Sequence, residues 1–440
     1  MQSSPKVAIM SRFRKDLSIP SLIAHVRFLF EKIQDPRSLK RSDIPIVDHL
    51  MSGLAVFGLK FPSLLDYDRK RSKDATAENL RNLYMIKNPP SDTYLRERLD
   101  EVDPDNIRPA FKKLFALMQR GKALEEFEYL DGYVLLSGDG TGHFSSSNVS
   151  CPYCCKKKHS NGTTTYYHQM FGVCVVHPDK KNVIPLCPEP ILNDDGSTKN
   201  DCERNACKRF LEKFRSEHPH LKAILIEDGL SSTAPNIRMI EEFGLKYILV
   251  AKPGDHQFLF DQLEESEHTQ YYEEKTKDGF YHQFRFVNKV AINKSNQDVK
   301  VNLIEYRQTD SKGKETNFSW VTNIYVSTIN VMKIMKGGRA RWKIENETFN
   351  TLKNLGYNFE RNYGHGKKYL ATIFCMLMML AFLIDQIQEI CCPLFQKCRL
   401  ALYTCRELWE NMRVLFRRLN LISWENFYAI LADEGILDTS

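Results

Sequence analysis

Short apolar segments alternate with amphipathic segments through the middle of the chain. The apolar runs are bounded by turn and acidic residues, and we expect them to form strands at 133–138, 167–176, 183–186, 223–227 and 247–250. Residues 201–217 and 234–243 instead place their apolar side chains on one helical face. Strands that alternate with helices in this way predict a layered α/β fold.

Two of the predicted strands end in an aspartate followed by glycine, at Asp139-Gly140 and at Asp228-Gly229. If the two strands are neighbours, both carboxylates lie at the same edge of the sheet. An Asp-Gly pair at a strand end is also a common turn. Carboxylate oxygens are the ligands that Mg²⁺ prefers, so the two aspartates together predict a divalent metal site.

A third acid on a helix packed against that edge would complete a site for two metal ions about 4 Å apart, the arrangement used for phosphoryl displacement. A helix is predicted to begin at Arg339 or Ala340 and to run through Lys353, and it contains Glu345 and Glu347. At about 100° per residue, Glu345 shares a face with Arg341 and Phe349, whereas Glu347 lies on a polar face. The helical pattern therefore favours Glu345 as the third ligand.

The rest of the chain divides around this α/β region. Residues 19–130 have helical spacing and a basic stretch near Arg69, residues 254–328 are β-rich, and the chain is helical again from Lys367. We expect a helical DNA-binding region at 1–130, a catalytic core at 131–253 and 329–366 that is interrupted by a β-rich insertion at 254–328, and a helical C-terminal region at 367–440.

Charge and hydropathy restrict the partners. Lysine and arginine exceed aspartate and glutamate by 62 to 55, a net charge of +7, which favours a polyanionic partner. Residues 1–15 contain no apolar core of a secretory signal, so we expect a cytoplasmic protein. The apolar run Leu370 to Ile384 is shorter than the roughly 20 residues that span a bilayer, so a buried helix and no membrane partner are expected.

Cys151 and Cys154 form a C-x-x-C pair, which is half of a structural zinc site. Candidates for the remaining ligands are Cys155, His159, His168, Cys187, Cys202 and Cys207. The alternative is a cluster of reduced, buried thiols.

Four segments together resemble one family. They are Leu136 to Thr141, Ile226 to Gly229, Trp320 to Asn323 and Arg341 to Glu345, and they are similar to the DDE transposases of bacterial insertion sequences. The resemblance covers roughly residues 131–366, and the Arg-Trp-x-Ile-Glu helix after a Trp-x-Thr strand is its specific part. It implies an RNase H-like catalytic core, cleavage of double-stranded DNA at transposon ends, strand transfer to target DNA, and a homodimer in the synaptic complex of a nucleoid-associated bacterial enzyme.

The resemblance also implies roles for individual residues. Asp139, Asp228 and Glu345 match the ligands of Mg²⁺, for which Mn²⁺ can substitute. Arg341 matches an arginine that contacts DNA near the cleaved bond. Trp320 matches a tryptophan that holds an unstacked base, although a core tryptophan in a β-sheet is the other reading.

Two positions depart from the family pattern. The family has a tyrosine three positions before the arginine, where this chain has Gly338. It has a lysine seven positions after the glutamate, where this chain has Leu352, and Lys353 one position later is the candidate DNA contact instead.

Three other functions fit the same sequence. A structure-selective nuclease with this core would cleave DNA without joining ends. A catalytically inactive DNA-binding regulator would keep the basic charge but not the chemistry. A metalloenzyme for small phosphoesters would need neither the helical regions nor the basic charge.

Overall fold

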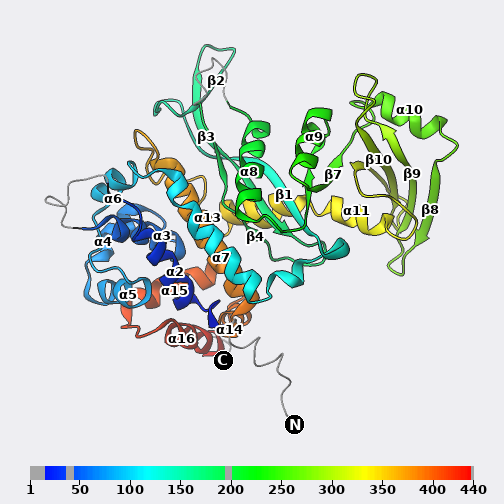
Figure 1. Cartoon of the computed structure of the whole chain (residues 1–440). Coiled ribbons are helices and arrows are strands. Elements are labelled where there is room, and N and C mark those ends of the chain that lie inside the picture. The colour runs from blue at the N-terminus through cyan, green and yellow to red at the C-terminus, as the bar shows by residue number, and fades with distance from the viewer. Residues whose placement is uncertain (1–14, 36–43, 194–200, 438–440) are drawn as a thin grey trace, which may run out of the picture.

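The computed structural model describes residues 15–35, 44–193 and 201–437. Residues 1–14, which carry most of the segment used to argue against a secretory signal, lie outside this range. The described residues contain a sheet of eleven strands with helices on its faces, next to a body made of helices (Figure 1). The predicted mixed α/β class is confirmed.

Three parallel strands form the centre of the sheet. They are β1 (Val134–Ser146), β6 (Ala223–Glu227) and β7 (Lys246–Val250), and they are adjacent in that order. Their apolar side chains are buried because helices cover the sheet, as continuous apolar runs predict. β1 pairs with β6 up to Ser137 and Ile226, so both aspartates lie two residues beyond the last paired residues. The prediction that these two strands are neighbours is confirmed.

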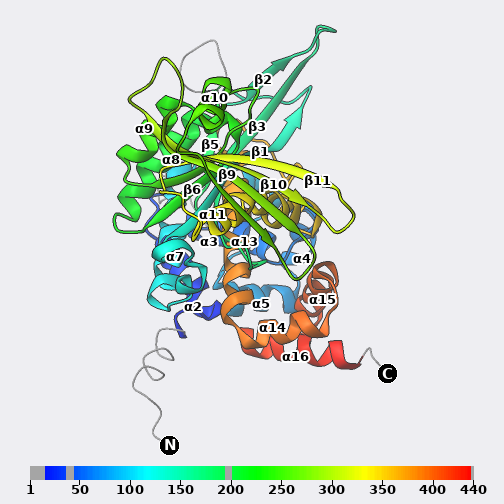
Figure 2. The ribbon, with the colours of Figure 1, turned by 90° about the vertical axis from the view of Figure 1, so that its right-hand side faces the viewer.

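Antiparallel strands extend the sheet on both sides. β3 (Thr164–Val176) pairs with β1, and β2 (Cys155–Lys158), β4 (Ile184–Pro185) and β5 (Glu189–Ile191) pair with β3. On the other side, β11 (Glu315–Thr322) pairs with β7 and leads to β10 (Lys300–Thr309), β9 (Tyr281–Ala291) and β8 (Gln270–Lys275). The β-rich segment 254–328 therefore continues the central sheet, and it also holds helix α10 (Gln257–Glu265) (Figure 2).

Helices α8 (Glu203–Glu217) and α9 (Ala234–Glu242) connect the strands, close to the predicted bounds. The helix predicted to begin at 339 or 340 begins earlier and is not one continuous α-helix. α11 (Val331–Arg339) already begins at Val331, and it is followed by a π-helix (Ile344–Phe349) and by α12 (Asn350–Asn354). Gly337 and Gly338 lie in α11. Because glycine has a low helix propensity, this pair made a helix at 331–339 difficult to predict.

The N-terminal and C-terminal helices pack together into a single body beside the sheet (Figure 1). Its N-terminal members are α2 (Ile19–Phe30), α3 (Ile46–Gly58), α4 (Leu64–Arg71), α5 (Asp74–Tyr84), α6 (Asp92–Leu99) and α7 (Arg108–Arg120). Its C-terminal members are α13 (Leu370–Cys391), α14 (Pro393–Ala401), α15 (Cys405–Arg418) and α16 (Trp424–Leu437).

Helix α13 is the centre of this body. It has 22 residues and is long and apolar enough to cross a membrane, but its most apolar window is 100% buried inside the protein. The expectation of a buried helix at Leu370 to Ile384 is confirmed, and the helix is longer than the apolar run itself.

Candidate active site and metal centre

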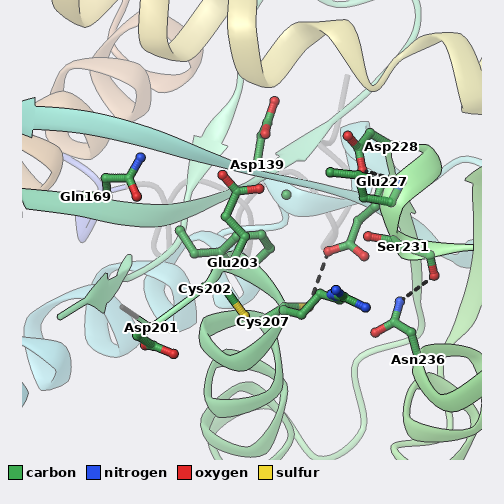
Figure 3. A pocket seen from close by; sticks show the side chains of 14 residues that line it. Asp139, Gln169, Asp201, Cys202, Glu203, Cys207, Glu227, Asp228, Ser231 and Asn236 are labelled. Atoms are coloured by element: carbon green, nitrogen blue, oxygen red, sulfur yellow. Dashed lines mark hydrogen bonds between the residues drawn. The ribbon is translucent and has the colours of Figure 1, made fainter. Parts of the chain in front are cut away.

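Asp139 and Asp228 line the same cavity at the edge of the sheet. The cavity has a volume of about 340 Å³, and its acidic lining consists of Asp139, Asp201, Glu203, Glu227 and Asp228 (Figure 3). Asp139 Oδ1 accepts a hydrogen bond from the backbone N–H of Gly140 at 2.8 Å, and Asp228 Oδ1 accepts one from Leu230 at 3.0 Å. β1 continues through Asp139 to Ser146, so the expectation that a strand ends at this aspartate is wrong, whereas β6 does end at Glu227, directly before Asp228. In both aspartates the second carboxylate oxygen takes no part in these backbone hydrogen bonds.

Glu345 is linked to Asp139 through the side chain of Arg341, which contacts both carboxylates. The Nη1 atom of Arg341 lies 2.9 Å from Glu345 Oε1 and 3.4 Å from Asp139 Oδ2. The side chain of Glu345 is not part of the described lining of the cavity that holds Asp228. Asp139 is therefore the acid that the other two have in common: it shares a cavity with Asp228 and an arginine with Glu345.

Contacts to two strands fix the helix that carries Glu345. The hydroxyl of Ser137 in β1 donates to the backbone oxygen of Arg341 at 2.9 Å. The ring of Phe349 lies against β3 at Gly172, where a Cβ atom would come within 2.9 Å of it. The backbone N–H of Asn350 donates to the carbonyl of Glu345 across a π turn. Such turns occur frequently at functional sites.

The carboxylates influence one another electrostatically. The pKa of Asp139 is raised to about 6, chiefly by burial. Arg341 and the backbone N–H of Gly140 oppose this rise, whereas the charges of Glu203 and Glu345 add to it. Burial, and then the charge of Asp228, also raise the pKa of Glu203. A divalent cation at this place would relieve the repulsion among these groups.

Glu203 was missed by the sequence analysis. It lies in the first turn of α8, and in Figure 3 its side chain extends from that helix towards Asp139. A Cβ atom on Gly140 would lie 2.0 Å from Glu203 Oε1, so the glycine after Asp139 makes room for this carboxylate. A single glutamate at a helix start is ordinary, which is why the sequence carried no signal for it.

Trp320 is placed differently from the predicted base-binding role. Its side chain is only 1% exposed and is stacked on Phe318 with ring centroids 5.7 Å apart. A Cβ atom on Gly338 would lie 2.6 Å from Trp320 Nε1, so α11 covers the indole. In this conformation Trp320 is a core residue, because no base can reach its ring face. The same contact explains why glycine occupies position 338.

The remaining predicted DNA contact, Lys353, forms an ion pair with Glu360, with Nζ and Oε1 2.8 Å apart. Leu352 beside it is fully buried, so a lysine at that position would lose its hydration.

Cys151, Cys154, His168 and His365 form a possible metal site that is compatible with zinc, and their candidate ligand atoms all lie within 4.8 Å of one another. The other proposed ligands lie elsewhere. Cys155 Sγ donates to the carbonyl of Ile191, Cys207 Sγ donates to Glu227, and His159 is exposed. His365 was not among the predicted ligands, since it lies far from the cysteines in the sequence.

Comparison with known proteins gives little further information. No family model matches the chain, and no curated protein matches it. Among solved structures, the chain is similar to the piggyBac transposase in a synaptic complex with hairpin DNA, with 12% identity and a TM-score of 0.42. The match covers 98% of this chain and 81% of that one. Similarity at this level defines neither a fold nor an activity.

Proposed function

We propose that the protein is a DNA transposase of the DDE type, with an RNase H-like core that cleaves phosphodiester bonds at transposon ends and joins the freed 3′-hydroxyl to target DNA. The observation that carries the proposal is the position of Asp139, which shares a cavity with Asp228 and an arginine with Glu345. Parallel β1, β6 and β7 flanked by antiparallel β3 support the RNase H-like assignment.

The donor set fits Mg²⁺, because the residues around Asp139 offer carboxylate oxygens and the cavity is open to solvent-borne ions. Asp139, Asp228 and Glu345 would hold the metal, with Mn²⁺ as a substitute. Bound metal ions would supply activation of the attacking hydroxyl and stabilisation of the leaving oxygen.

The chain's own residues position the ions and the DNA. Arg341 pairs with both Asp139 and Glu345 and offsets one of their two negative charges. With metal bound to these carboxylates, the guanidinium would be available to contact a phosphate bidentately. Because the metal ligands must be ionised and the pKa of Asp139 is raised to about 6 in the metal-free protein, we expect Mg²⁺ to bind more weakly as the pH falls below about 6.

The proposal includes partners and a second metal. Double-stranded DNA, both transposon end and target, would bind through the basic surface, and two chains would pair in the synaptic complex. The enzyme would act in the bacterial cytoplasm at the nucleoid. Cys151 and Cys154 would hold a structural zinc.

A structure-selective nuclease is the second candidate, because the same acids would cleave DNA without joining ends. Transfer of the cleaved DNA end to a target distinguishes a transposase from a nuclease. Purified protein is incubated with Mg²⁺, a plasmid target and labelled DNA fragments from both flanks of its own gene, where the ends of a transposon would lie. A transposase cleaves at the flanks and transfers the label to the plasmid, whereas a nuclease only cleaves.

Matched variants make this test specific. Glu345→Gln should abolish cleavage, while Glu347→Gln on the same π-helix should leave it unchanged. Asp228→Asn should also abolish cleavage. Equal activity of wild type and Asp228→Asn, or inactivity of both on every DNA, would contradict the proposed chemistry and favour a binding protein.

A further inference from the structure

We infer that Cys151, Cys154, His168 and His365 bind one zinc ion in a closed tetrahedral site, and that this ion fastens the β-hairpin that follows Asp139 to the segment that follows the Glu345 helix. The inference specifies the zinc proposed above. It does not depend on transposase activity.

Five of the six ligand separations are close to those of a tetrahedral zinc, and the sixth, from Cys151 Sγ to the ring nitrogen of His365, lies within 4.8 Å. Bonds of about 2.3 Å to sulfur and about 2.0 Å to nitrogen require separations of about 3.8 Å between two sulfurs, about 3.5 Å between sulfur and nitrogen, and about 3.3 Å between two nitrogens. The two Sγ atoms are 3.8 Å apart, and the two Nε2 atoms are 3.2 Å apart. The printed sulfur to nitrogen separations are 3.4, 3.4 and 3.2 Å.

Burial and ligand type indicate a structural ion. The four ligand residues are between 0% and 9% exposed, so water has no evident open position on the ion. Two thiolates and two neutral imidazoles would bring the site with Zn²⁺ to net neutrality, which removes the cost of burying a charge. The other ring nitrogen of His365 lies 2.9 Å from the carbonyl of Gly366, an outer contact that orients the ring.

The ligands come from three places in the chain. Cys151 and Cys154 lie between β1 and β2, and His168 lies in β3, so three ligands stand at the base of the hairpin of β2 and β3 that projects from the sheet (Figure 1). His365 lies between α12 and α13, in the connection from the Glu345 helix to the helical body.

Neighbouring contacts hold the same connection from the helical body. The carboxylate of Asp100 accepts hydrogen bonds from the backbone N–H groups of Lys367, Lys368 and Leu370 at 2.8, 2.9 and 3.0 Å. On the hairpin side, the ring of Tyr153 stacks on Tyr369 with centroids 5.1 Å apart. A metal at the four ligands would thus close a link between the catalytic sheet and the helical body, with residues 355–369 held between them.

Metal analysis of the full chain tests the site. We expect one zinc per chain in wild type, and loss of zinc in Cys154→Ser and His365→Ala. Two controls should keep it: Cys155→Ser, which changes the adjacent buried thiol, and His159→Ala, which changes a nearby exposed histidine. His365→Cys should restore binding, because it supplies a fourth ligand again. Cobalt substitution should give the visible absorption of tetrahedral thiolate coordination.

Hydrogen exchange tests the fastening role. Removing zinc with a chelator should raise amide exchange by about tenfold or more in residues 355–369 and in the hairpin, and leave β9 and β10 unchanged. A metal-free wild type, or zinc retained in both ligand variants, would overturn the site. Zinc that binds without protecting residues 355–369 would overturn the fastening role. Asp139→Asn should keep its zinc, because Asp139 is not a ligand of this ion. If the wild-type protein contains zinc but neither cleaves nor joins DNA, only the transposase proposal is refuted, and the zinc site stands.

Discussion

Replacing Arg341 with methionine removes the cation that joins two of the candidate metal ligands. Its Nη1 atom lies 2.9 Å from Glu345 and 3.4 Å from Asp139. At an effective dielectric constant of about 20, unit charges at these separations attract by about 6 and about 5 kcal/mol. Hydration offsets most of this, because the side chains of Asp139 and Glu345 remain 25% and 36% exposed. We therefore expect a net loss of about 2 kcal/mol in the free energy of unfolding, between the values for exposed and buried pairs.

The loss should depend on metal. In a chelating buffer the two carboxylates of Arg341→Met repel each other, whereas bound Mg²⁺ replaces the missing positive charge. We expect the difference between wild type and variant to fall below about 1 kcal/mol at saturating Mg²⁺. Urea unfolding followed by tryptophan fluorescence, in both buffers, measures it.

Arg339→Met is the matched control. The Arg339 guanidinium lies over the ring of Phe318 at 5.1 Å and donates to Gln308, away from the acids. Its effect on stability should be the same with and without Mg²⁺. If Arg341→Met shows the same loss in both buffers, Arg341 does not hold the place of a metal, and our reasoning about the site is refuted.

Three further predictions concern other parts of the molecule. Lys60→Met leaves the buried carboxylate of Asp385 without its ion-pair partner and should cost about 3–5 kcal/mol in urea unfolding, while Lys60→Met with Asp385→Leu should recover most of it. Burial raises the pKa of Glu227 from 4.5 to about 7, so its stabilising contribution is complete below about pH 4.5 and is lost as the pH rises through 7. Glu227→Gln should therefore become more stable relative to wild type, by about 3 kcal/mol, between pH 4.5 and pH 8 in metal-free buffer. Lys157→Gln with Lys158→Gln removes two exposed cations of β2, and should lower the slope of log affinity for DNA against log salt by about 2.

Each of these has a contradicting result. Additive effects in the Lys60 and Asp385 double variant would show that the two charges do not interact. A difference between Glu227→Gln and wild type that does not change with pH would show that Glu227 titrates normally. An unchanged salt slope in the lysine variant would show that Lys157 and Lys158 do not contact the DNA.

Local patterns predicted the part of the site that lies on strands. Asp139 and Asp228 each end an apolar run, and burial of such runs in adjacent parallel strands brings their ends together. Glu345 was predicted as the third acid because its helix has an apolar face that must pack on the sheet, and its role as a metal ligand stays a prediction. These inferences depend on periodicity and burial, which a single sequence displays directly.

The missed features depend on contacts between distant segments. His365 meets Cys154 across 211 positions, and no local pattern marks a histidine in a loop as a ligand. Glu203 approaches Asp139 only because Gly140 leaves space for it. Trp320 is covered by α11 at Gly338, so the tertiary packing of a glycine decides its exposure. The π turn at Glu345 is likewise invisible to an argument that assumes 3.6 residues per turn.

Anomalous diffraction from crystals of the full chain soaked in Mn²⁺ tests the central claim most directly. The account predicts two manganese peaks about 4 Å apart, bound by Asp139, Asp228 and Glu345, with Arg341 displaced from Asp139. The absence of manganese between these acids at saturating concentration, with the Arg341 contacts intact, would contradict it.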